Sequence, residues 1–245
     1  MSNDASNFIS SRKRKTALSF QKIKEILWYI SECYTIFQLD EIIYSKKWCS
    51  INTSSKFEDY LKMEFVDNYL IKQKKLIQNK LSILEQINFS YETEKRFTDL
   101  DGIERLDKID IYINNLGLQN IWKDSNEHVY FAIECKRINK LSDCKNYIGD
   151  IKKFCVRKYK QTRLPFEGMI AFLEKEKLSH QIVSENINLK LKDDTAINTT
   201  KYLEGLRVNS SFDGSYQSSH SKEYNKSEIF FIYHLLFDYS KSIIN

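Results

Sequence analysis

Two carboxylates and one lysine stand where a β-hairpin would bring them together. Asp110 lies within the alternating segment Ile109–Ile113, and Glu134, Cys135 and Lys136 follow an apolar run. A period of two residues puts Glu134 and Lys136 on one face of a strand and Cys135 on the other. If the two segments pair, Asp110 lies beside Glu134. Two carboxylates and a backbone carbonyl suit a hard cation such as Mg²⁺, so this grouping predicts the chemistry of metal-assisted phosphodiester hydrolysis.

The hairpin that positions these groups is predicted from alternation and turn residues. In the first strand the three isoleucines face one way, while Asp110 and Tyr112 face the other. Turn residues follow at 114–117, and a polar run at 123–127 makes the connection longer than a tight turn. The second strand is expected over His128–Ile138. At its end Lys136 has three possible tasks, which are to orient the attacking water, to deprotonate it, or to hold the scissile phosphate.

This arrangement resembles the PD-(D/E)xK nuclease superfamily, which has the restriction-endonuclease-like fold. Asp110 matches the Asp of its first motif, preceded here by isoleucine where the name pattern has Pro, and Glu134-Cys135-Lys136 matches the second motif in full. By that resemblance Asp110, Glu134 and the carbonyl oxygen of Cys135 bind the metal, and Lys136 is the catalytic lysine. Mg²⁺ is the expected cofactor and Mn²⁺ is expected to substitute for it. The likeness covers about residues 56–175.

A fourth carboxylate is expected from a helix that begins near residue 56. Its apolar stripe consists of Phe57, Leu61, Phe65 and Tyr69. The segment EDYLKMEFVDNYL is similar to the first helix of several nuclease-like families, which carries a Glu towards the metal site. By that likeness Glu58 is the candidate for both a catalytic and a metal-binding role, and Glu64 is the alternative. Both residues border the stripe, so helical geometry alone does not separate them.

Cationic and histidine side chains outside the hairpin are candidate phosphate contacts, namely Arg12, Lys13, Arg14, Lys15, Lys153, Lys158, His220 and Lys222. The first four lie in segment 1–16, which is expected to be a flexible tail that is either simply solvated or an arm for phosphates. The next two decorate a helix expected over about 144–159, whose basic face is the alternative explanation. The last two share a face of a strand expected to be exposed, where they contact phosphate or merely form its surface. His234, in an apolar run, is expected to be a core histidine.

The composition indicates one α/β domain with a mixed central sheet flanked by helices. The chain has 245 residues, 42% of them apolar, and its one Pro and six Gly favour long regular elements. We expect a basic tail at 1–16, a helical extension at 17–55, a core at 56–175, and a C-terminal helix and hairpin at 176–245 that complete the sheet. The five cysteines form no C-x-x-C pair or zinc spacing and are typical of reduced cytoplasmic thiols. No segment reaches transmembrane length.

The expected activity is Mg²⁺-dependent cleavage of nucleic acid, of DNA before RNA and by an endonuclease, with a role in restriction or phage defence. The net charge of +5 permits a nucleic-acid partner without requiring one. The alternative is a nucleic-acid-binding or regulatory subunit that keeps the fold and acts with a partner. A purely structural interaction protein is a third class, for which the sequence offers no heptad array. Because no separate target-recognition domain is evident, specificity would come from a homodimer, a partner protein or insertions, or would be absent.

Overall fold

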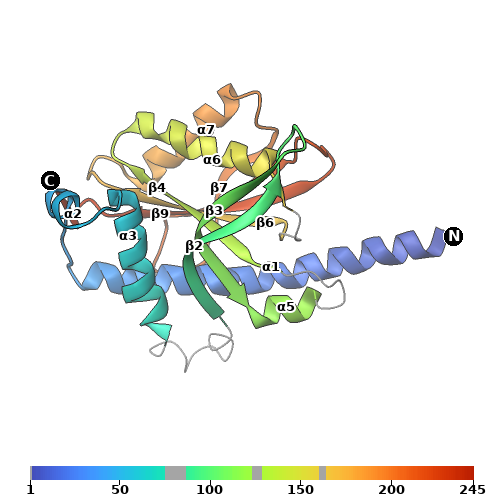
Figure 1. Ribbon diagram of the computed structural model, residues 1–245, viewed down its shortest axis with the longest axis horizontal. Helices are drawn as coiled ribbons and strands as arrows, with labels where there is room; N and C mark the ends of the chain where they lie inside the picture. Colours follow the sequence, from blue (N-terminus) through green and yellow to red (C-terminus); the bar gives the residue numbers. More distant parts are fainter. Residues whose placement is uncertain (1, 75–86, 123–128, 160–163) are drawn as a thin grey trace.

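The computed structural model describes residues 2–74, 87–122, 129–159 and 164–245 (Figure 1). Its helices are α1 (Ser2–Leu39), α2 (Lys46–Asn52), α3 (Phe57–Phe65), α5 (Leu116–Trp122), α6 (Cys144–Val156) and α7 (His180–Asp193), with a π-helical turn η1 (Val66–Ile71) and a 3-10 turn η4 (Leu141–Asp143). Its strands are β1 (Tyr44–Ser45), β2 (Ile87–Thr98), β3 (Glu104–Asn115), β4 (Phe131–Ile138), β5 (Lys158–Tyr159), β6 (Phe166–Leu173), β7 (Thr199–Gly205), β8 (Ser215–Ser221), β9 (Ile229–Asp238) and β10 (Ile243–Ile244).

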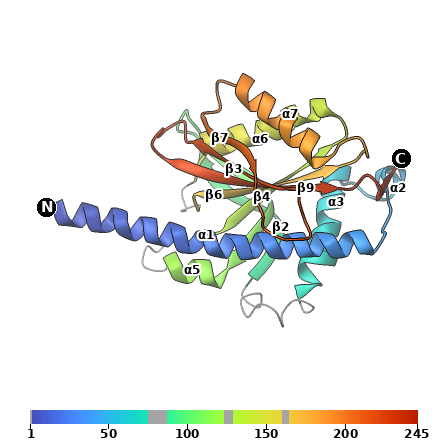
Figure 2. The same cartoon turned by 180° about the vertical axis from the view of Figure 1, so that it is seen from behind.

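Within these residues, eight strands form one sheet in the order β5-β2-β3-β4-β6-β9-β8-β7. The strands β4, β6 and β9 are parallel, and the pairings β2–β3, β3–β4, β8–β9 and β7–β8 are antiparallel. Helices α6 and α7 lie over one face, while α1 and α5 lie over the other (Figures 1 and 2). The predicted mixed α/β sheet flanked by helices, with an N-terminal helical elaboration, is therefore confirmed. The predicted C-terminal hairpin is present as β8 and β9.

Helix α1 supplies much of the core on its side of the sheet. The apolar stripe predicted for residues 20–37 is buried, and Ile23, Ile26, Leu27, Ile30 and Tyr34 are each 2% exposed or less. Burying one such side chain contributes about 1.5–3 kcal/mol to folding before conformational entropy is subtracted. The helix is longer than that stripe requires. Residues 2–16, where the sequence predicted a flexible tail, continue α1 as helix, and this end projects past the body of the molecule (Figure 1).

The opposite face is covered by helices whose ends differ slightly from the prediction. Helix α6 ends at Val156 rather than near residue 159, because the next residues turn into β5 and Tyr159 pairs with Phe97 of β2. Helix α7 begins after Ser179, whose side chain accepts a hydrogen bond from the backbone N of Ile182. The sequence pattern predicts this helix over about 179–189, but it continues to Asp193.

The connections around the central hairpin also depart from the prediction. The turn expected at 114–117 is the start of α5, because Asn115 Oδ1 accepts a hydrogen bond from the backbone N of Leu118 at 2.9 Å and so acts as a cap. Strand β4 begins at Phe131. His128 and the polar connection 123–127 lie outside the described residues. The sequence pattern also predicts that the helix beginning near residue 56 continues, bent or broken, through Leu76, Leu81 and Leu84 to Ile87, and residues 75–86 of that stretch lie outside the described residues too. The sequence predicts a turn at 164–168 and a strand at 169–173, but strand β6 begins at Phe166, because it pairs along its length with β9.

All five cysteines are buried thiols without a disulfide bond. Burial raises the pKa of Cys33 to about 12 and that of Cys144 to about 11. These thiols therefore stay protonated and serve as packing groups rather than nucleophiles. Among the described helices, none combines the length and apolar character needed to cross a bilayer.

Candidate functional site

The E-x-K triplet lies on β4, between β3 and β6 near the centre of the sheet. The side chain of Cys135 is fully buried in the core on the α1 side. Glu134, which is 8% exposed, and Lys136 alternate with it and so lie on the α6 face, as the period of two predicted. Gly168 of β6 pairs with Ile133, and a Cβ added there would come within 2.6 Å of Ile133 Cγ1. Glycine at this position lets β6 pack closely against the strand that carries the triplet.

Asp110 meets the triplet at the end of the β3–β4 ladder. The last paired residues are Ile111 and Ile133, and Asp110 is the next residue along β3. Its Oδ2 accepts a hydrogen bond from the backbone N of Cys135 at 2.8 Å. The carboxylate thus takes the place of a backbone acceptor where the ladder stops. The sequence predicts Asp110 beside Glu134, and the contact that the structure shows is with the next residue of that strand, Cys135.

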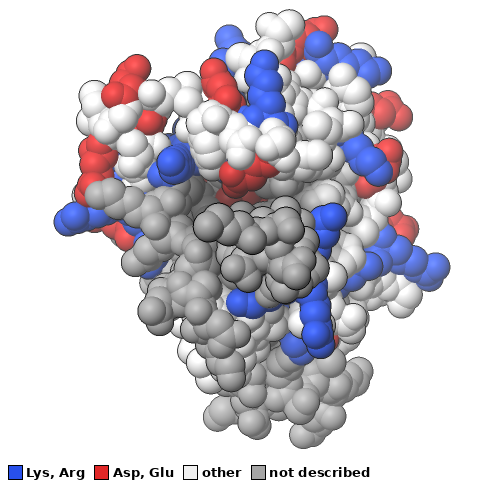
Figure 3. Space-filling view, turned by 90° about the vertical axis from the view of Figure 1, so that its right-hand side faces the viewer, with Lys and Arg blue, Asp and Glu red and all other residues white. Residues whose placement is uncertain are grey.

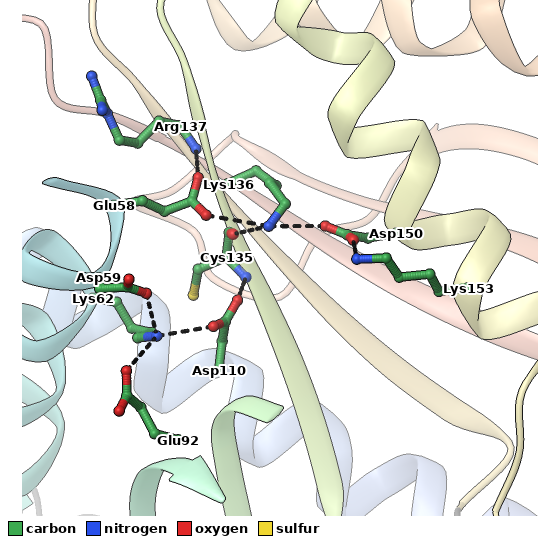
Figure 4. A network of polar contacts seen from close by, with 10 residues as sticks. All are labelled: Glu58, Asp59, Lys62, Glu92, Asp110, Cys135, Lys136, Arg137, Asp150 and Lys153. Atoms are coloured by element: carbon green, nitrogen blue, oxygen red, sulfur yellow. Dashed lines mark hydrogen bonds and ion pairs between the residues drawn. The ribbon is translucent and has the colours of Figure 1, made fainter. Parts of the chain in front are cut away.

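The ammonium of Lys136 stands among three oxygen atoms from three parts of the chain (Figure 4). Its Nζ lies 3.2 Å from Glu58 Oε1, 3.0 Å from Asp150 Oδ2 and 3.1 Å from the carbonyl oxygen of Cys135. Burial alone would lower the pKa of Lys136, but the charges of Asp150 and Glu58 outweigh it and raise the pKa. Lys136 is therefore a cation at neutral pH in this state, which suits holding an anion or orienting water better than removing a proton.

Glu58 reaches β4 from the first turn of α3. Its Oε2 accepts a hydrogen bond from the backbone N of Arg137 at 2.9 Å, and its Oε1 contacts Lys136. The alternative candidate, Glu64, lies two turns further along the helix and accepts a hydrogen bond from Asn68 Nδ2 at 2.8 Å. The structure therefore brings Glu58, rather than Glu64, into contact with the E-x-K strand. Whether Glu58 binds the metal stays a prediction.

Glu58→Gln should raise the Mg²⁺ concentration needed for half-maximal cleavage by about 10- to 100-fold, the usual cost of losing a carboxylate at or beside a metal site. Gln keeps an acceptor for Arg137 N, so the helix should stay docked. Glu64→Gln is the matched control on the same helix, and we expect it to change the requirement by less than about twofold. A Mg²⁺ titration of cleavage by both variants is the measurement. A raised requirement in Glu64→Gln alone would show that the wrong glutamate has been chosen.

Two further charged residues complete the network, and the sequence analysis did not assign them to the site. Lys62 of α3 donates from Nζ to Asp110 Oδ1 at 2.9 Å, and Asp150 of α6 pairs with Lys136. Both are buried, with 1% and 2% exposure. Each lies on an otherwise apolar stripe of its helix. Lys62 precedes the buried Phe65 by three residues, and Asp150 follows the buried Tyr147 by three. A charged residue on a buried stripe is the signal that would have identified them, because burying a charge requires a partner.

The oxygen donors suit Mg²⁺, but ammonium groups stand among them. Among the described residues, no three carboxylate, histidine or cysteine side chains are grouped as a ready metal site. Lys62 lies against Asp110, and Lys136 lies against Glu58 and the carbonyl oxygen of Cys135. These acceptors are all oxygen atoms, which is the donor chemistry that Mg²⁺ and Mn²⁺ require. The donor set therefore fits such an ion in kind, and in this structure it holds ammonium groups instead.

The candidate phosphate contacts are scattered rather than gathered at this site. Lys153 is the nearest, because its Nζ pairs with Asp150 Oδ1 at 2.5 Å while its side chain stays 51% exposed. Lys158 is exposed on the edge strand β5, three strands from β4. Lys13 and Arg14 are exposed on the projecting half of α1, and the side chain of Arg12 lies outside the described residues.

Lys15 belongs to the same stretch of α1 and lies 5.7 Å from the centre of the Trp122 ring of α5. Helix α5 begins at the C-terminal end of β3, five residues beyond Asp110. The structure therefore does not bring the basic cluster at 12–15, whose Lys15 lies against α5, to the candidate site. On that side of the molecule, Lys and Arg side chains are interspersed with Asp and Glu (Figure 3).

The prediction that His220 and Lys222 lie on an exposed, phosphate-contacting strand is wrong. His220 is 0% and Lys222 is 7% exposed, because His220 packs against Phe230 and Lys222 lies over the Phe230 ring beside α6. Lys222 Nζ donates to the carbonyl oxygen of Phe154 at 2.6 Å. His234 is a core histidine, as predicted, with 0% exposure.

A buried polar chain explains how both histidines are accommodated. His234 Nδ1 is 2.8 Å from Tyr147 Oη, and its Nε2 is 2.8 Å from Ser218 Oγ. The same hydroxyl is 2.8 Å from Nε2 of His220, whose Nδ1 is 3.2 Å from Thr199 Oγ1. Burial lowers the pKa of His220 to about 3, and burial together with His220 lowers the pKa of His234. Both imidazoles are therefore neutral in the folded protein near pH 7.

Acid should destabilise the protein through these two histidines. Unfolded histidines titrate near pH 6.5, so below that pH the unfolded chain binds protons that the folded chain does not, and stability falls as the pH drops towards 3. For each histidine, the free energy of unfolding should fall by as much as about 1.4 kcal/mol per pH unit. Urea unfolding of the wild type and of His220→Gln at pH 7, 6 and 5 measures this. Equal pH slopes for the two proteins would contradict the assignment.

Comparison of the chain with protein-family models, with curated proteins and with solved structures finds no match. A family is therefore not shown for this chain by these comparisons.

Proposed function

We propose that the chain is a divalent-cation-dependent nuclease that hydrolyses phosphodiester bonds of nucleic acid, of DNA before RNA, and as an endonuclease. The observation that supports it best is the convergence of α3, β3 and β4 on one strand end. Asp110 Oδ2 is 2.8 Å from the backbone N of Cys135, and Glu58 Oε2 is 2.9 Å from the backbone N of Arg137. Lys136 lies 3.2 Å from Glu58. An incidental Glu–Lys pair on a solvated hairpin would not draw a carboxylate from a separate buried helix.

The residues that would hold Mg²⁺ are Asp110, Glu134, Glu58 and the carbonyl oxygen of Cys135. A bound Mg²⁺ would lower the pKa of a water ligand and offset charge on the phosphate. Lys136 supplies a cation that can hold a phosphate oxygen or orient the attacking water. In this proposal the residues of the chain act by position and charge, because the phosphoryl centre needs an aligned nucleophile and compensation for negative charge.

Asp150 sets the position of Lys136 from the side of α6. Its Oδ2 lies 3.0 Å from Lys136 Nζ, opposite Glu58 in the view of Figure 4. The buried carboxylate keeps Lys136 charged and keeps its ammonium over the strand. Lys153 shares the same carboxylate and is exposed, so it is the best-placed surface cation for a neighbouring phosphate.

A second candidate function is a nucleic-acid-binding or regulatory subunit that acts with a partner protein. The observation that favours it is the neutralisation of Asp110 by Lys62 and of Glu58 by Lys136, together with the lack of a ready metal group in the described residues. A buried salt bridge of this kind can help to specify a single folded structure and need have no part in catalysis. Under this alternative the chain binds nucleic acid and does not cleave it.

The experiment that separates the two candidates is cleavage of supercoiled plasmid, single-stranded DNA and RNA by the purified chain in Mg²⁺ or Mn²⁺, with binding measured on the same preparation. Nicking of DNA that is faster than cleavage of RNA supports the proposal. Binding without cleavage of any substrate supports the subunit and rejects the nuclease.

The cellular setting is part of the proposal. Five buried free thiols support a reducing, cytoplasmic location, and a role in restriction or phage defence follows from the motif resemblance. A homodimer or a partner protein would supply target choice.

Removing residues 1–16 should weaken DNA binding and flatten its dependence on salt. Four clustered cations would release up to about four counterions, which lowers the slope of log affinity against log salt by about two to four. Replacing Arg12, Lys13, Arg14 and Lys15 by Gln keeps the length of α1 and is the matched variant. Fluorescence anisotropy at several salt concentrations measures both quantities. Unchanged affinity and slope in both variants would mean that this end of α1 is only solvated.

A further inference from the structure

Lys62 is a lysine buried within a helix that packs against the candidate site. Its side chain is 1% exposed, yet it ends in a charged group surrounded by acids (Figure 4). Its Nζ lies 2.9 Å from Asp59 Oδ1, 2.9 Å from Asp110 Oδ1 and 3.8 Å from Glu92 Oε1. These three carboxylates come from α3, β3 and β2, so the lysine joins three elements at one point.

Stability alone does not explain a lysine at this position. Removing an ammonium from water costs several kcal/mol, and apolar replacement of a buried ion pair is often neutral or stabilising. Position 62 also stands on the stripe that buries Phe65 and Tyr69, where a leucine or methionine would pack. What distinguishes Lys62 is its partner, since Asp110 is also the carboxylate that reaches the E-x-K strand.

Each of the two carboxylate oxygens of Asp110 accepts a hydrogen bond from a different donor. Oδ1 accepts from Lys62 Nζ at 2.9 Å, and Oδ2 accepts from the backbone N of Cys135 at 2.8 Å. One donor on each oxygen fixes the plane of the carboxylate relative to β4. The positive charge of Lys62 also lies directly beside a carboxylate that would hold the metal ion, and like charges repel strongly at this distance and burial.

We propose that Lys62 is a positioning residue for Asp110 and that its ammonium competes with a divalent cation for the Asp110 carboxylate. It holds Asp110 in place when no ion is bound, and it weakens the affinity of the site for divalent cations. This inference rests on the proposed function in one respect, which is that Asp110 belongs to the metal site.

The test is the affinity of the full-length chain for Mn²⁺ alone, measured by the electron paramagnetic resonance signal of free Mn²⁺. Lys62→Met keeps the length of the side chain and removes the charge, and we expect it to bind Mn²⁺ about tenfold or more tightly than the wild type. Lys108→Met is the matched control, because Lys108 pairs with Glu92 at 2.9 Å but is 55% exposed. It should change the affinity by less than about twofold, since water screens an exposed charge. Adding Asp110→Asn to Lys62→Met should abolish the gain.

A second measurement uses the wild type and does not depend on the folding of a variant. The Nζ resonance of Lys62, followed by lysine ¹⁵N NMR, should shift saturably as Mg²⁺ is added, because its partner Asp110 becomes shared. Asp110→Asn should lose this response. No shift of the Lys62 signal at any Mg²⁺ concentration would overturn the inference. Equal or weaker Mn²⁺ binding by a folded Lys62→Met, or no binding by either protein, would overturn it as well.

Failure of this inference and failure of the proposed function give different results. Tighter Mn²⁺ binding by Lys62→Met, without DNA cleavage by any variant or by the wild type, would support the role of Lys62 and reject the nuclease. DNA cleavage by the wild type, with unchanged Mn²⁺ affinity in Lys62→Met, would support the nuclease and reject the role of Lys62.

Discussion

Lys136→Met should slow DNA cleavage by about 100- to 1000-fold while leaving DNA affinity within a few-fold of the wild type. The loss of one preorganised cation or donor at a reacting phosphate has an effect of this size. The variant should still fold, because Glu58 keeps its hydrogen bond from Arg137 N and Asp150 keeps its ion pair with Lys153. Asp110→Asn and Glu134→Gln should show losses of the same order.

Lys153→Met is the matched control for Lys136→Met. It removes the same charge from the same partner, Asp150, but from a side chain that is 51% exposed. At saturating DNA, where a lost phosphate contact does not limit the rate, we expect a loss of no more than about threefold, because an exposed ion pair contributes little. Single-turnover cleavage of a labelled duplex by both variants gives the comparison. Wild-type cleavage by Lys136→Met would end its assignment as the catalytic lysine.

Chelation of divalent cations should abolish cleavage, and Mg²⁺ or Mn²⁺ should restore it. The expected donors are Asp110, Glu134, Glu58 and the carbonyl oxygen of Cys135, and oxygen donors accept Mg²⁺, Mn²⁺ and Ca²⁺ alike. Ca²⁺ should therefore bind and support little turnover, since the larger ion polarises water less and tolerates looser geometry. Plasmid nicking after exhaustive dialysis against EDTA, with each ion added back, is the measurement. Cleavage that persists undiminished after chelation would contradict metal dependence.

The central hairpin could be predicted because its information is local. Alternation along β3 and the apolar run before Glu134 determine which face each side chain takes, and the register then follows from pairing. The contact of Asp110 with Cys135 N agrees with this pairing of β3 and β4. The β8–β9 hairpin could be predicted for the same reason.

The residues that sequence reasoning missed depend on partners distant in the chain. Lys62 and Asp110 are 48 residues apart, and although a lysine on an apolar stripe signals a buried partner, the sequence does not show which distant carboxylate that partner is. His220 is buried beside β7, and although the sequence predicts a strand near 203–208, it does not show that this strand pairs with β8. The ends of α6 and β6 were likewise decided by strand pairing rather than by local preference.

The most direct test of the site is a comparison of wild type and Asp110→Asn in one assay, with DNA binding and plasmid nicking measured on the same preparations in Mg²⁺. Asn keeps the shape of the side chain and an acceptor for Cys135 N, so the fold and the DNA affinity should persist. We expect the wild type to nick the plasmid and Asp110→Asn to bind it without nicking. Nicking by Asp110→Asn at the wild-type rate, or no nicking by the wild type in either Mg²⁺ or Mn²⁺, would contradict it.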